Sequence, residues 1–379
     1  MKKLLITLLV VCLLPISRVQ ALDNDVTPNA KSAILIEANS RQILYDKNAE
    51  EKLYPASTTK IMTMILMFEA LRNKKISFDD EITTSKYAAS MGGSQVYLEV
   101  GESLSLKDMF KSIAIASAND ASVAVAEHIA GSINKFVEMM NDKAKKLGLK
   151  NTHFKNATGL HDPDHYTCAH DLAIMAAYLI GIGGEDLFAV TSLYDSYIRE
   201  DTKQSFWLVN TNKLLKLYNG VDGLKTGYTK EAGYCLVTTA QRDGQRIIGV
   251  LMKETAPKTR NEEMCSLLDY GFNNYKQVTI FKKDTLIEQH LVDKMDNLTI
   301  DVKCKKDIVY TKAKSADAKV STKVNYKDNF LPVKQGDVIG TLDVIVDGKT
   351  IATYDVYSDT NASKSTYLSK TIKTLKYLF

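Results

Sequence analysis

One stretch of the chain, Pro55-Ala56-Ser57-Thr58-Thr59-Lys60, comes at the start of a strongly apolar helical pattern. The pattern begins near Ser57 and ends at about Asn73, and its apolar residues lie almost all the way round the helix. A helix with apolar residues on every side is buried inside a domain. We therefore predict that this stretch opens a buried helix.

Ser57 and Lys60 in this stretch are a candidate nucleophile and base. Residues three apart share a helix face, so the serine hydroxyl and the lysine amine can meet. Free backbone N–H groups at a helix N-terminus suit a developing oxyanion, and a buried lysine with a lowered pKa could take the serine proton. The pair alone is a weak indication, because Ser132-Ile133-Asn134-Lys135 matches the same pattern.

Two further motifs strengthen this interpretation. Ser117-Ala118-Asn119 lies in a stretch of small residues between predicted helices, and Lys225-Thr226-Gly227 lies on a predicted strand. S-x-x-K followed by S-D-N and K-T-G is the signature of penicillin-binding proteins and class A β-lactamases. All three elements occur here in that order, with alanine in the middle of the second.

The chain resembles the low-molecular-mass penicillin-binding proteins, specifically the serine-type D-alanyl-D-alanine carboxypeptidases. The match covers essentially the whole chain and extends beyond the three motifs. The blocks that carry it are Tyr54–Lys60, Ser117–Asp120, Asn156–Leu160, Val221–Thr229 and Ala232–Tyr234.

This resemblance implies a reaction on the stem pentapeptide of peptidoglycan, with β-lactam antibiotics as covalent inhibitors. Ser57 would attack the carbonyl of the penultimate D-alanine, form an acyl-enzyme and release the terminal D-alanine, with Lys60 as the base. Ser117 would relay a proton to the leaving amine, and Asn119 would bind the substrate amide. No cofactor and no metal are implied.

The strand motif would bind the other end of the substrate. Lys225 and Thr226 would hold the substrate carboxylate, and Lys225 would help to keep Lys60 neutral by charge repulsion. The backbone N–H groups of Ser57 and Tyr228 would form the oxyanion hole. Gly227 would let the strand approach the ligand closely. Family members often carry histidine or threonine where Tyr228 stands.

The order of predicted elements gives an α+β fold. A hairpin over Ser32–Tyr45 precedes helical patterns over Leu106–Leu149 and Asp171–Ile182, and strands over Val221–Glu254 follow, with a turn at Asp243-Gly244. The resemblance implies a β-lactamase/transpeptidase-like catalytic domain over residues 22–276. A small all-β domain, similar to a β-sandwich, is expected over residues 277–357, with a hairpin turn at Asp347-Gly348.

The 379 residues carry a formal net charge of +4, which is too small and too balanced to suggest nucleic-acid binding. Residues 1–21 are predicted to be a signal peptide. Residues 358–379 are expected to be a polar linker followed by a basic amphipathic helix that lies on a membrane surface, with a helix packed on the protein as the alternative. The enzyme would then be exported and peripherally anchored at the outer face of the cytoplasmic membrane.

Three other functions remain open at this point. A class A-like β-lactamase needs a base for deacylation, and no such glutamate can be assigned between Asn119 and Lys225. A catalytically silent penicillin sensor or cell-wall binding module would not need its catalytic residues intact. A D-alanyl-D-alanine endopeptidase usually lacks the second domain.

Two groups of reactive side chains are open to other interpretations. The histidines and acids of His161–His165, with Cys168 and His170, resemble a metal cluster, but Pro163 breaks any helix there and a structural role is favoured. Besides Cys12 in the signal segment there are four cysteines, which could pair or stay as buried thiols. They are Cys168, Cys235, Cys265 and Cys304.

Overall fold

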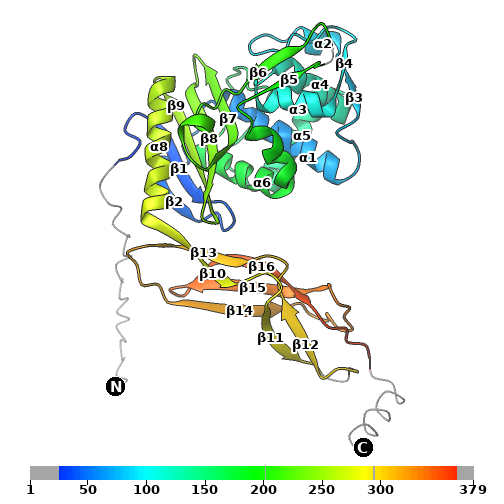
Figure 1. Cartoon of the computed structure of the whole chain (residues 1–379), viewed down its shortest axis with the longest axis vertical. Helices are drawn as coiled ribbons and strands as arrows, with labels where there is room; N and C mark the ends of the chain where they lie inside the picture. Colours follow the sequence, from blue (N-terminus) through cyan, green and yellow to red (C-terminus); the bar gives the residue numbers. More distant parts are fainter. Residues whose placement is uncertain (1–24, 201, 293–294, 365–379) are drawn as a thin grey trace, which may run out of the picture.

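The computed structural model describes residues 25–200, 202–292 and 295–364. The predicted signal peptide and the predicted amphipathic helix near the C-terminus lie outside these ranges, so both stay predictions. The chain forms two parts, a larger domain of helices around a sheet and a smaller domain of strands alone (Figure 1). This arrangement confirms the predicted α+β domain followed by an all-β domain.

The larger domain is built on a five-stranded antiparallel sheet in the order β2-β1-β9-β8-β7. The predicted N-terminal hairpin forms β1 and β2, and β1 pairs with β9 from the far end of the domain. The predicted turn at Asp243-Gly244 joins β8 to β9, and both residues have positive φ, as a tight hairpin turn requires. The strands are β1 Ser32–Glu37, β2 Ile43–Lys47, β7 Val221–Thr229, β8 Gly233–Arg242 and β9 Gln245–Glu254.

Helices cover both faces of this sheet, which explains why β1 is apolar at consecutive positions (Figure 1). Ile34 and Ile36 face the larger core with helices α1 and α6, whereas Ala33 and Leu35 face a smaller core with helix α8. The helices are α1 Lys60–Arg72, α2 Lys86–Ala89, α3 Leu106–Ala114, α4 Asn119–Ala130, α5 Ile133–Lys146, α6 Ala169–Thr191, α7 Leu214–Leu217 and α8 Pro257–Asn274. Two short hairpins complete the domain, β3 Glu81–Thr83 with β4 Ser103–Ser105, and β5 Asp195–Ile198 with β6 Phe206–Val209.

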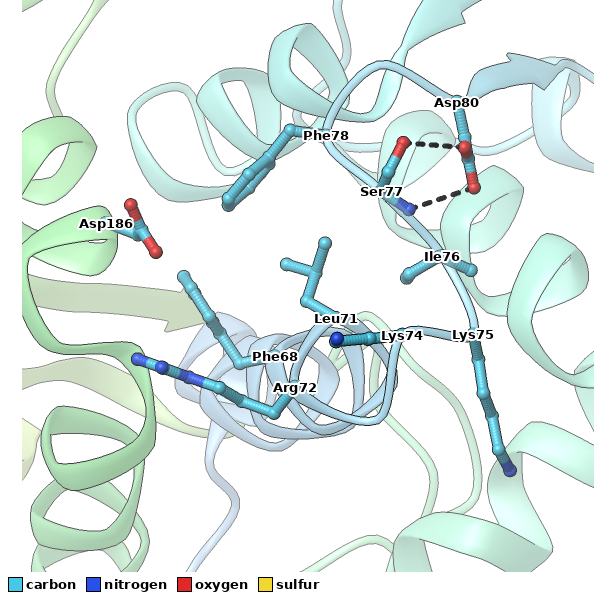
Figure 2. Close-up of a pocket in the computed structure, with 10 residues that line it drawn as sticks. All are labelled: Phe68, Leu71, Arg72, Lys74, Lys75, Ile76, Ser77, Phe78, Asp80 and Asp186. Atoms are coloured by element: carbon cyan, nitrogen blue, oxygen red, sulfur yellow. Dashed lines mark hydrogen bonds between the residues drawn. The ribbon is translucent and has the colours of Figure 1, made fainter.

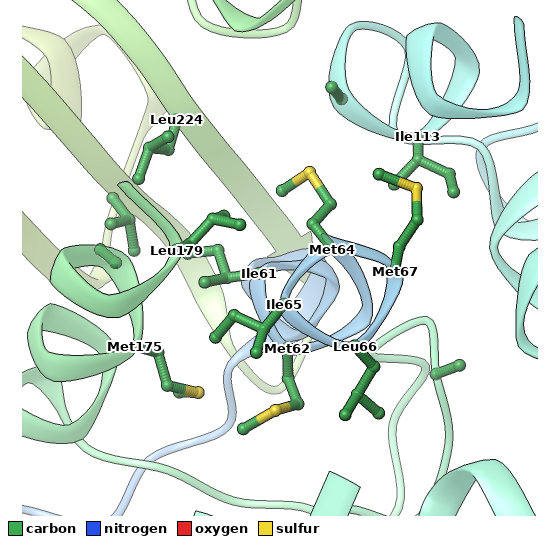
Figure 3. Close-up of a cluster of buried hydrophobic side chains, with 14 of the residues drawn as sticks. Ile61, Met62, Met64, Ile65, Leu66, Met67, Ile113, Met175, Leu179 and Leu224 are labelled. Carbon is green, nitrogen blue, oxygen red and sulfur yellow. The ribbon is translucent and has the colours of Figure 1, made fainter. Parts of the chain in front are cut away.

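Helix α1 is the buried helix that the sequence predicts. Its side chains point outward in every direction and still meet other side chains, with Ile61 facing Leu179 of α6 and Met67 facing Ile113 of α3 (Figure 3). Residues 61–65 are all fully buried. Because the helix is fixed on all sides, it gives the residues at its N-terminus a rigid support.

Helix α6 is the one helix in the described ranges that is long and apolar enough to cross a membrane by length and composition. It lies against α1 and against strands β1 and β9 inside the larger domain. Gly184 interrupts it with non-helical dihedral angles. Its apolar character is therefore that of a core helix.

The smaller domain has two antiparallel sheets, a pair β10-β13 and a five-stranded sheet β11-β12-β16-β15-β14, around one apolar core. The predicted turn at Asp347-Gly348 joins β15 to β16. The strands are β10 Tyr275–Phe281, β11 Leu286–Leu291, β12 Thr299–Lys303, β13 Ile308–Ala313, β14 Val320–Tyr326, β15 Val338–Val346 and β16 Lys349–Ser358.

The expectation of a polar linker after residue 357 is wrong for the part that the structure describes. Ala362 is fully buried in the core of the smaller domain and forms a bridge with Val333. Asp296 accepts the backbone N–H of Ser363 at 2.7 Å. Asn361, Ser363 and Lys364 face solvent, but Ser358 and Ala362 are buried, and the backbone completes the domain up to Lys364.

The four cysteines within the described ranges are all free thiols. Cys168, Cys235 and Cys304 are buried. Of the two possibilities that the sequence leaves open, the structure shows thiols.

Candidate active site

Ser57 and Lys60 meet because a single turn of 3₁₀ helix, Ala56–Thr59, precedes α1. A 3₁₀ helix has three residues per turn, so residues i and i+3 lie directly above one another. The Lys60 Nζ atom is 3.1 Å from the Ser57 Oγ atom. The predicted pair is therefore in contact, through a tighter helical turn than the α-helix expected at this point.

Two carbonyl-type oxygens surround the Lys60 amine besides the Ser57 hydroxyl. Lys60 Nζ donates to Asn119 Oδ1 at 2.6 Å and to the backbone oxygen of Thr158 at 2.8 Å. A neutral amine has two hydrogens and one lone pair. The two hydrogens then go to these oxygens, and the lone pair is directed at the Ser57 hydroxyl proton.

The electrostatic surroundings of Lys60 favour that neutral form. Complete burial lowers the pKa of Lys60 well below its usual value, and the positive charge of Lys225 lowers it further. The carboxylate of Asp120 acts in the opposite direction without cancelling these effects. The repulsion by Lys225 that the resemblance implies is thus present, but desolvation is the larger cause.

Thr158 is a contact that the sequence interpretation did not assign. The side chain of Asn156 accepts hydrogen bonds from the backbone N–H groups of Thr158 and Gly159, which forms a tight turn. The turn aims the Thr158 carbonyl at Lys60. An Asn followed three residues later by Gly is a turn signal, but nothing local indicates what the turn faces.

Gly159 fits directly against the backbone that carries the nucleophile. It has φ of +86°, and a Cβ atom there would lie 1.8 Å from the backbone oxygen of Ala56. No other residue can occupy this position without moving the 3₁₀ turn. The close approach keeps the Lys60 acceptor and the Ser57 turn in one rigid unit.

We expect Gly159→Ala to lower the free energy of unfolding by at least about 2 kcal/mol more than Gly148→Ala does. Gly148 is the matched control because it also has positive φ, +74°, but a Cβ atom there would meet nothing within 4 Å. The difference between the two variants isolates the steric clash. Urea unfolding of both variants measures it, and equal losses would contradict the close packing described.

Ser117 and Asn119 approach the pair from the loop between α3 and α4. Ser117 has an unusual φ of 64° and lies 4% exposed on the wall of the pocket that contains Ser57. Asn119 begins α4, and its Nδ2 atom donates to the backbone oxygen of Gly92 at 2.6 Å. Since an amide nitrogen has two hydrogens, one of them is left for a ligand.

Strand β7 brings the third motif to the same pocket. Lys225 is 1% exposed, and burial, with a contribution from the charge of Arg260, lowers its pKa to about 7. The Thr226 hydroxyl donates to the Thr211 hydroxyl at 2.8 Å. Tyr228 lies at the mouth, where its exposed ring stacks on Tyr234 with centroids 4.3 Å apart.

Gly227 lines the pocket and also lies close to the backbone that carries the nucleophile. A Cβ atom on Gly227 would lie 2.8 Å from the backbone oxygen of Pro55 and 3.0 Å from the backbone nitrogen of Ser57. The glycine therefore lets β7 approach the turn that carries the nucleophile. A Cβ atom on either Gly159 or Gly227 would meet the same short segment, Pro55–Ser57, and the Ser57 backbone nitrogen lies near both positions.

Arg260 of α8 is a second residue that the sequence interpretation missed. It is 6% exposed and lines the pocket together with Ser57, Ser117 and Thr226. It donates to Asn261 Oδ1 and forms no ion pair with any residue in the described ranges. An arginine in a helix is ordinarily solvated, so its burial beside β7 follows only from the way α8 packs.

The pocket holding these residues has a volume of about 490 Å³. A cavity of about 540 Å³ lies at the other end of α1, where Phe68, Leu71 and Phe78 meet Arg72, Lys74 and Asp186 (Figure 2). None of the ten residues that line it belongs to the three motifs. Volume alone would not select the site, whereas the side-chain chemistry does.

The loop that contains His161–His165 supports the 3₁₀ turn that carries Ser57. His165 is 2% exposed, and its Nε2 atom lies 2.8 Å from the hydroxyl of Thr59 in the 3₁₀ turn. Its Nδ1 atom accepts the backbone N–H of Lys155 at 3.2 Å. This is the structural role that the sequence favoured. His170, which the sequence analysis grouped with these histidines, lies at the start of α6 with Glu50 and Asp171, and the three residues bring potential ligand atoms within 4.8 Å of one another.

His165 makes the stability of the protein depend on pH. Burial lowers its pKa to about 4 from 6.5, so the unfolded chain binds a proton between these values that the folded chain does not. Stability should therefore fall as pH drops from 6.5 to 4, by about 3 kcal/mol from this group. His165→Gln should remove that part of the slope. Urea unfolding at pH 7 and pH 4.5 tests this, and an unchanged slope in the variant would argue against it.

The sequence profile described as D-alanyl-D-alanine carboxypeptidase matches residues 18–256. The chain belongs to this family. A second profile, penicillin-binding protein 5, C-terminal domain, matches residues 275–364 of this carboxypeptidase, which agrees with the smaller domain ending after residue 357.

Known relatives cover nearly the whole of the carboxypeptidase. It is 44% identical to the D-alanyl-D-alanine carboxypeptidase DacF of Bacillus subtilis over 92% of this chain and 90% of that protein. Penicillin-binding protein 5 from Haemophilus influenzae superposes with a TM-score of 0.72 at 32% identity, covering 88% and 98% of the two chains. Penicillin-binding protein D2 from Listeria monocytogenes, solved in a cefotaxime-bound form, matches at 30% identity and a TM-score of 0.58, over 64% and 97%.

Proposed function

We propose that this carboxypeptidase removes the terminal D-alanine from peptidoglycan stem pentapeptides through an acyl-enzyme on Ser57. The observation that carries the proposal is the contact of Ser57 Oγ with a buried lysine amine whose two other partners are both acceptors. Lys60 takes the serine proton as Oγ attacks the carbonyl carbon of the penultimate D-alanine. The C–N bond then breaks, and the leaving amine receives a proton from Lys60 through Ser117.

The developing oxyanion binds to the backbone N–H groups of Ser57 and Tyr228 in this proposal. Asn119 donates its remaining amide hydrogen to the substrate backbone. Water then attacks the ester and releases the shortened peptide, which regenerates the Ser57 hydroxyl. A β-lactam follows the same first step, but its amine stays attached after the ring opens.

Two residues that line the pocket, Thr226 and Arg260, and the buried Lys225 beside Thr226 on β7 are the groups that we propose bind the terminal carboxylate of the substrate. We assign it to the Thr226 hydroxyl, the positive charge of Lys225 and the guanidinium of Arg260. Arg260 supports this assignment because a buried guanidinium without an ion pair in the described ranges is ready for an anionic ligand.

The proposed roles of the two lysines predict opposite effects of pH. Lys60 must be neutral, so acylation by penicillin should rise with pH around a midpoint well below 10.5. Lys225 should be protonated to hold the carboxylate, so the rate should fall again above about 7. The second-order acylation constant measured from pH 4 to 10 tests both limbs. A rate that climbs steadily up to pH 10 would contradict these roles.

The location of the mature chain in the cell is also a proposal. We place it outside the cytoplasmic membrane, where its substrate is, held to the surface by the basic amphipathic segment between residues 365 and 379. Loss of membrane association after deletion of these residues, with activity on a soluble pentapeptide retained, is the expected result.

Mass spectrometry of a muropeptide that contains pentapeptides tests the reaction class. Incubation with the enzyme should remove one alanine from each stem and leave cross-links unchanged. Shortening of cross-linked dimers to monomers would indicate an endopeptidase, and fast hydrolysis of penicillin without loss of alanine would indicate a β-lactamase. No change in the muropeptide would favour a silent binding protein.

A further inference from the structure

The hairpin β5–β6 presents two aromatic side chains to solvent beside the active-site pocket. Tyr197 and Trp207 are directly opposite each other in the strand register and are 48% and 54% exposed. Their neighbours Ile198 and Leu208 are fully buried, so the other face of the hairpin is seated on the core. Two large exposed aromatic rings side by side on a fixed hairpin are typical of a surface that binds a ligand.

The orientation of Trp207 is fixed. Its Nε1 atom donates to Asp195 Oδ2 at 3.0 Å across the hairpin. The strand that holds Tyr197 is itself anchored, because Lys111 Nζ donates to the backbone oxygen of Tyr197 at 3.2 Å. The rings therefore form a prepared surface, and little side-chain entropy is lost when a ligand binds.

The aromatic pair continues the wall of the active-site pocket. Val209, two residues after Trp207, lines the pocket with Ser57 and lies on the same face of the strand as Trp207. The pocket wall continues through Thr211 to Thr226 of β7 by a hydroxyl–hydroxyl contact of 2.8 Å. Trp207 thus lies about 7 Å beyond the pocket rim along the strand.

We infer that Tyr197 and Trp207 bind the glycan to which the stem peptide is attached, by stacking on the faces of its sugar rings. The inference rests on the proposed function and extends it from the peptide to the sugar. Four residues separate the cleaved bond from the sugar, a reach of up to about 13 Å in an extended peptide. Pyranose rings have apolar C–H faces that pack on aromatic rings, while their hydroxyl groups stay in water. An exposed tyrosine and tryptophan offer that combination of apolar ring and polar edge.

The test uses the fact that Trp207 is the one tryptophan in the sequence. Glycan strands of alternating N-acetylglucosamine and N-acetylmuramic acid, stripped of peptides, should shift the emission of the full chain to the blue in a saturable way. Tyr197→Ala should weaken this binding about fivefold or more. Leu217→Ala, which removes another exposed apolar side chain, is the matched control and should change nothing.

A kinetic arm separates this inference from the proposed function. Trp207→Ala should raise KM for glycan-linked pentapeptide about fivefold or more, while acylation by penicillin and release of D-alanine from free pentapeptide stay unchanged. Normal penicillin acylation shows that the variant is folded. Equal effects on free and linked substrates, or none on either, would overturn the inference and leave the proposed function intact. Absence of D-alanine release by the unaltered enzyme would instead overturn the proposed function.

A membrane surface is the other ligand that two exposed aromatic rings could bind, and vesicles test this alternative. Vesicles of phosphatidylglycerol should leave the Trp207 emission of a chain that ends at residue 364 unchanged. A blue shift with these vesicles and none with the glycan strands would show that the hairpin faces a membrane, and the inference would fall.

Discussion

Ser57→Ala should abolish both penicillin labelling and D-alanine release, a loss on the order of 10⁴-fold or more. The hydroxyl is the atom proposed to form the covalent bond, and no other serine among the described residues combines a buried amine partner with a place in the pocket. Ser117 shares the pocket, but its hydroxyl forms no hydrogen bond to Lys60 in the described structure. Gel labelling with a fluorescent penicillin and a D-alanine assay measure the two losses.

The chain contains its own control for this substitution. Ser132 is followed by Lys135 in the same S-x-x-K pattern, but its hydroxyl accepts the backbone N–H of Lys135 and caps α5. Ser132→Ala should therefore cost about 1 kcal/mol of stability and leave labelling intact. Labelling that survives Ser57→Ala would refute the assignment of the nucleophile.

Lys60→Met should slow acylation by about 10²–10⁴-fold, because it removes the base but keeps most of the volume of the side chain. The Ser57 hydroxyl would keep its place but lose the lone pair that takes its proton. Thr158 and Asn119 would each lose a donor, so stability should also fall, by about 1–3 kcal/mol for each buried acceptor left unpaired. Single-turnover labelling measures the rate, and circular dichroism shows whether the fold is kept.

Lys135→Met is the matched control for this substitution. Lys135 lies on the first turn of α5 and is exposed, so its replacement should leave both the rate and the fold unchanged. A Lys60→Met variant that is acylated at the normal rate would show that another group takes the proton.

The predicted site residues that lie close together in the structure are those carried by short motifs, and their catalytic and binding roles stay predictions. Each motif lies at the end of an element or on a strand, which a sequence pattern can locate. The residues in question are Ser57, Lys60, Ser117, Asn119 and Thr226. The oxyanion and carboxylate roles assigned to Tyr228 and Lys225 stay predictions, although both residues lie on the expected strand.

The residues that were missed depend on tertiary packing. Thr158 contributes only its backbone oxygen, and every residue has one. The residue type at position 158 therefore gives no sign of this contact. Arg260 is 203 residues from Ser57 and 143 residues from Ser117 in the sequence, and it reaches their pocket only because α8 packs on the sheet. Gly227 was recognised, but its close approach to the Ser57 turn could not be seen from the sequence.

The fold followed from hydrophobic patterning with one clear error. Strands β1, β8 and β9 and the buried helix have continuous apolar runs because they are buried on all sides, whereas strands of the smaller domain such as β12 alternate between buried and more exposed residues. Residues 358–364 were predicted to be a linker because they are polar and small. Ala362 alone carries the apolar contact there, which is too little for a pattern to show.

The central claim is that Ser57 carries the acyl group, and peptide mapping by mass spectrometry after incubation with benzylpenicillin tests it most directly. The account predicts one adduct per chain, with the mass of intact penicillin, on the peptide that contains Ser57. An adduct on a peptide that contains Ser117 or Ser132 and lacks Ser57, or no adduct at all, would contradict it.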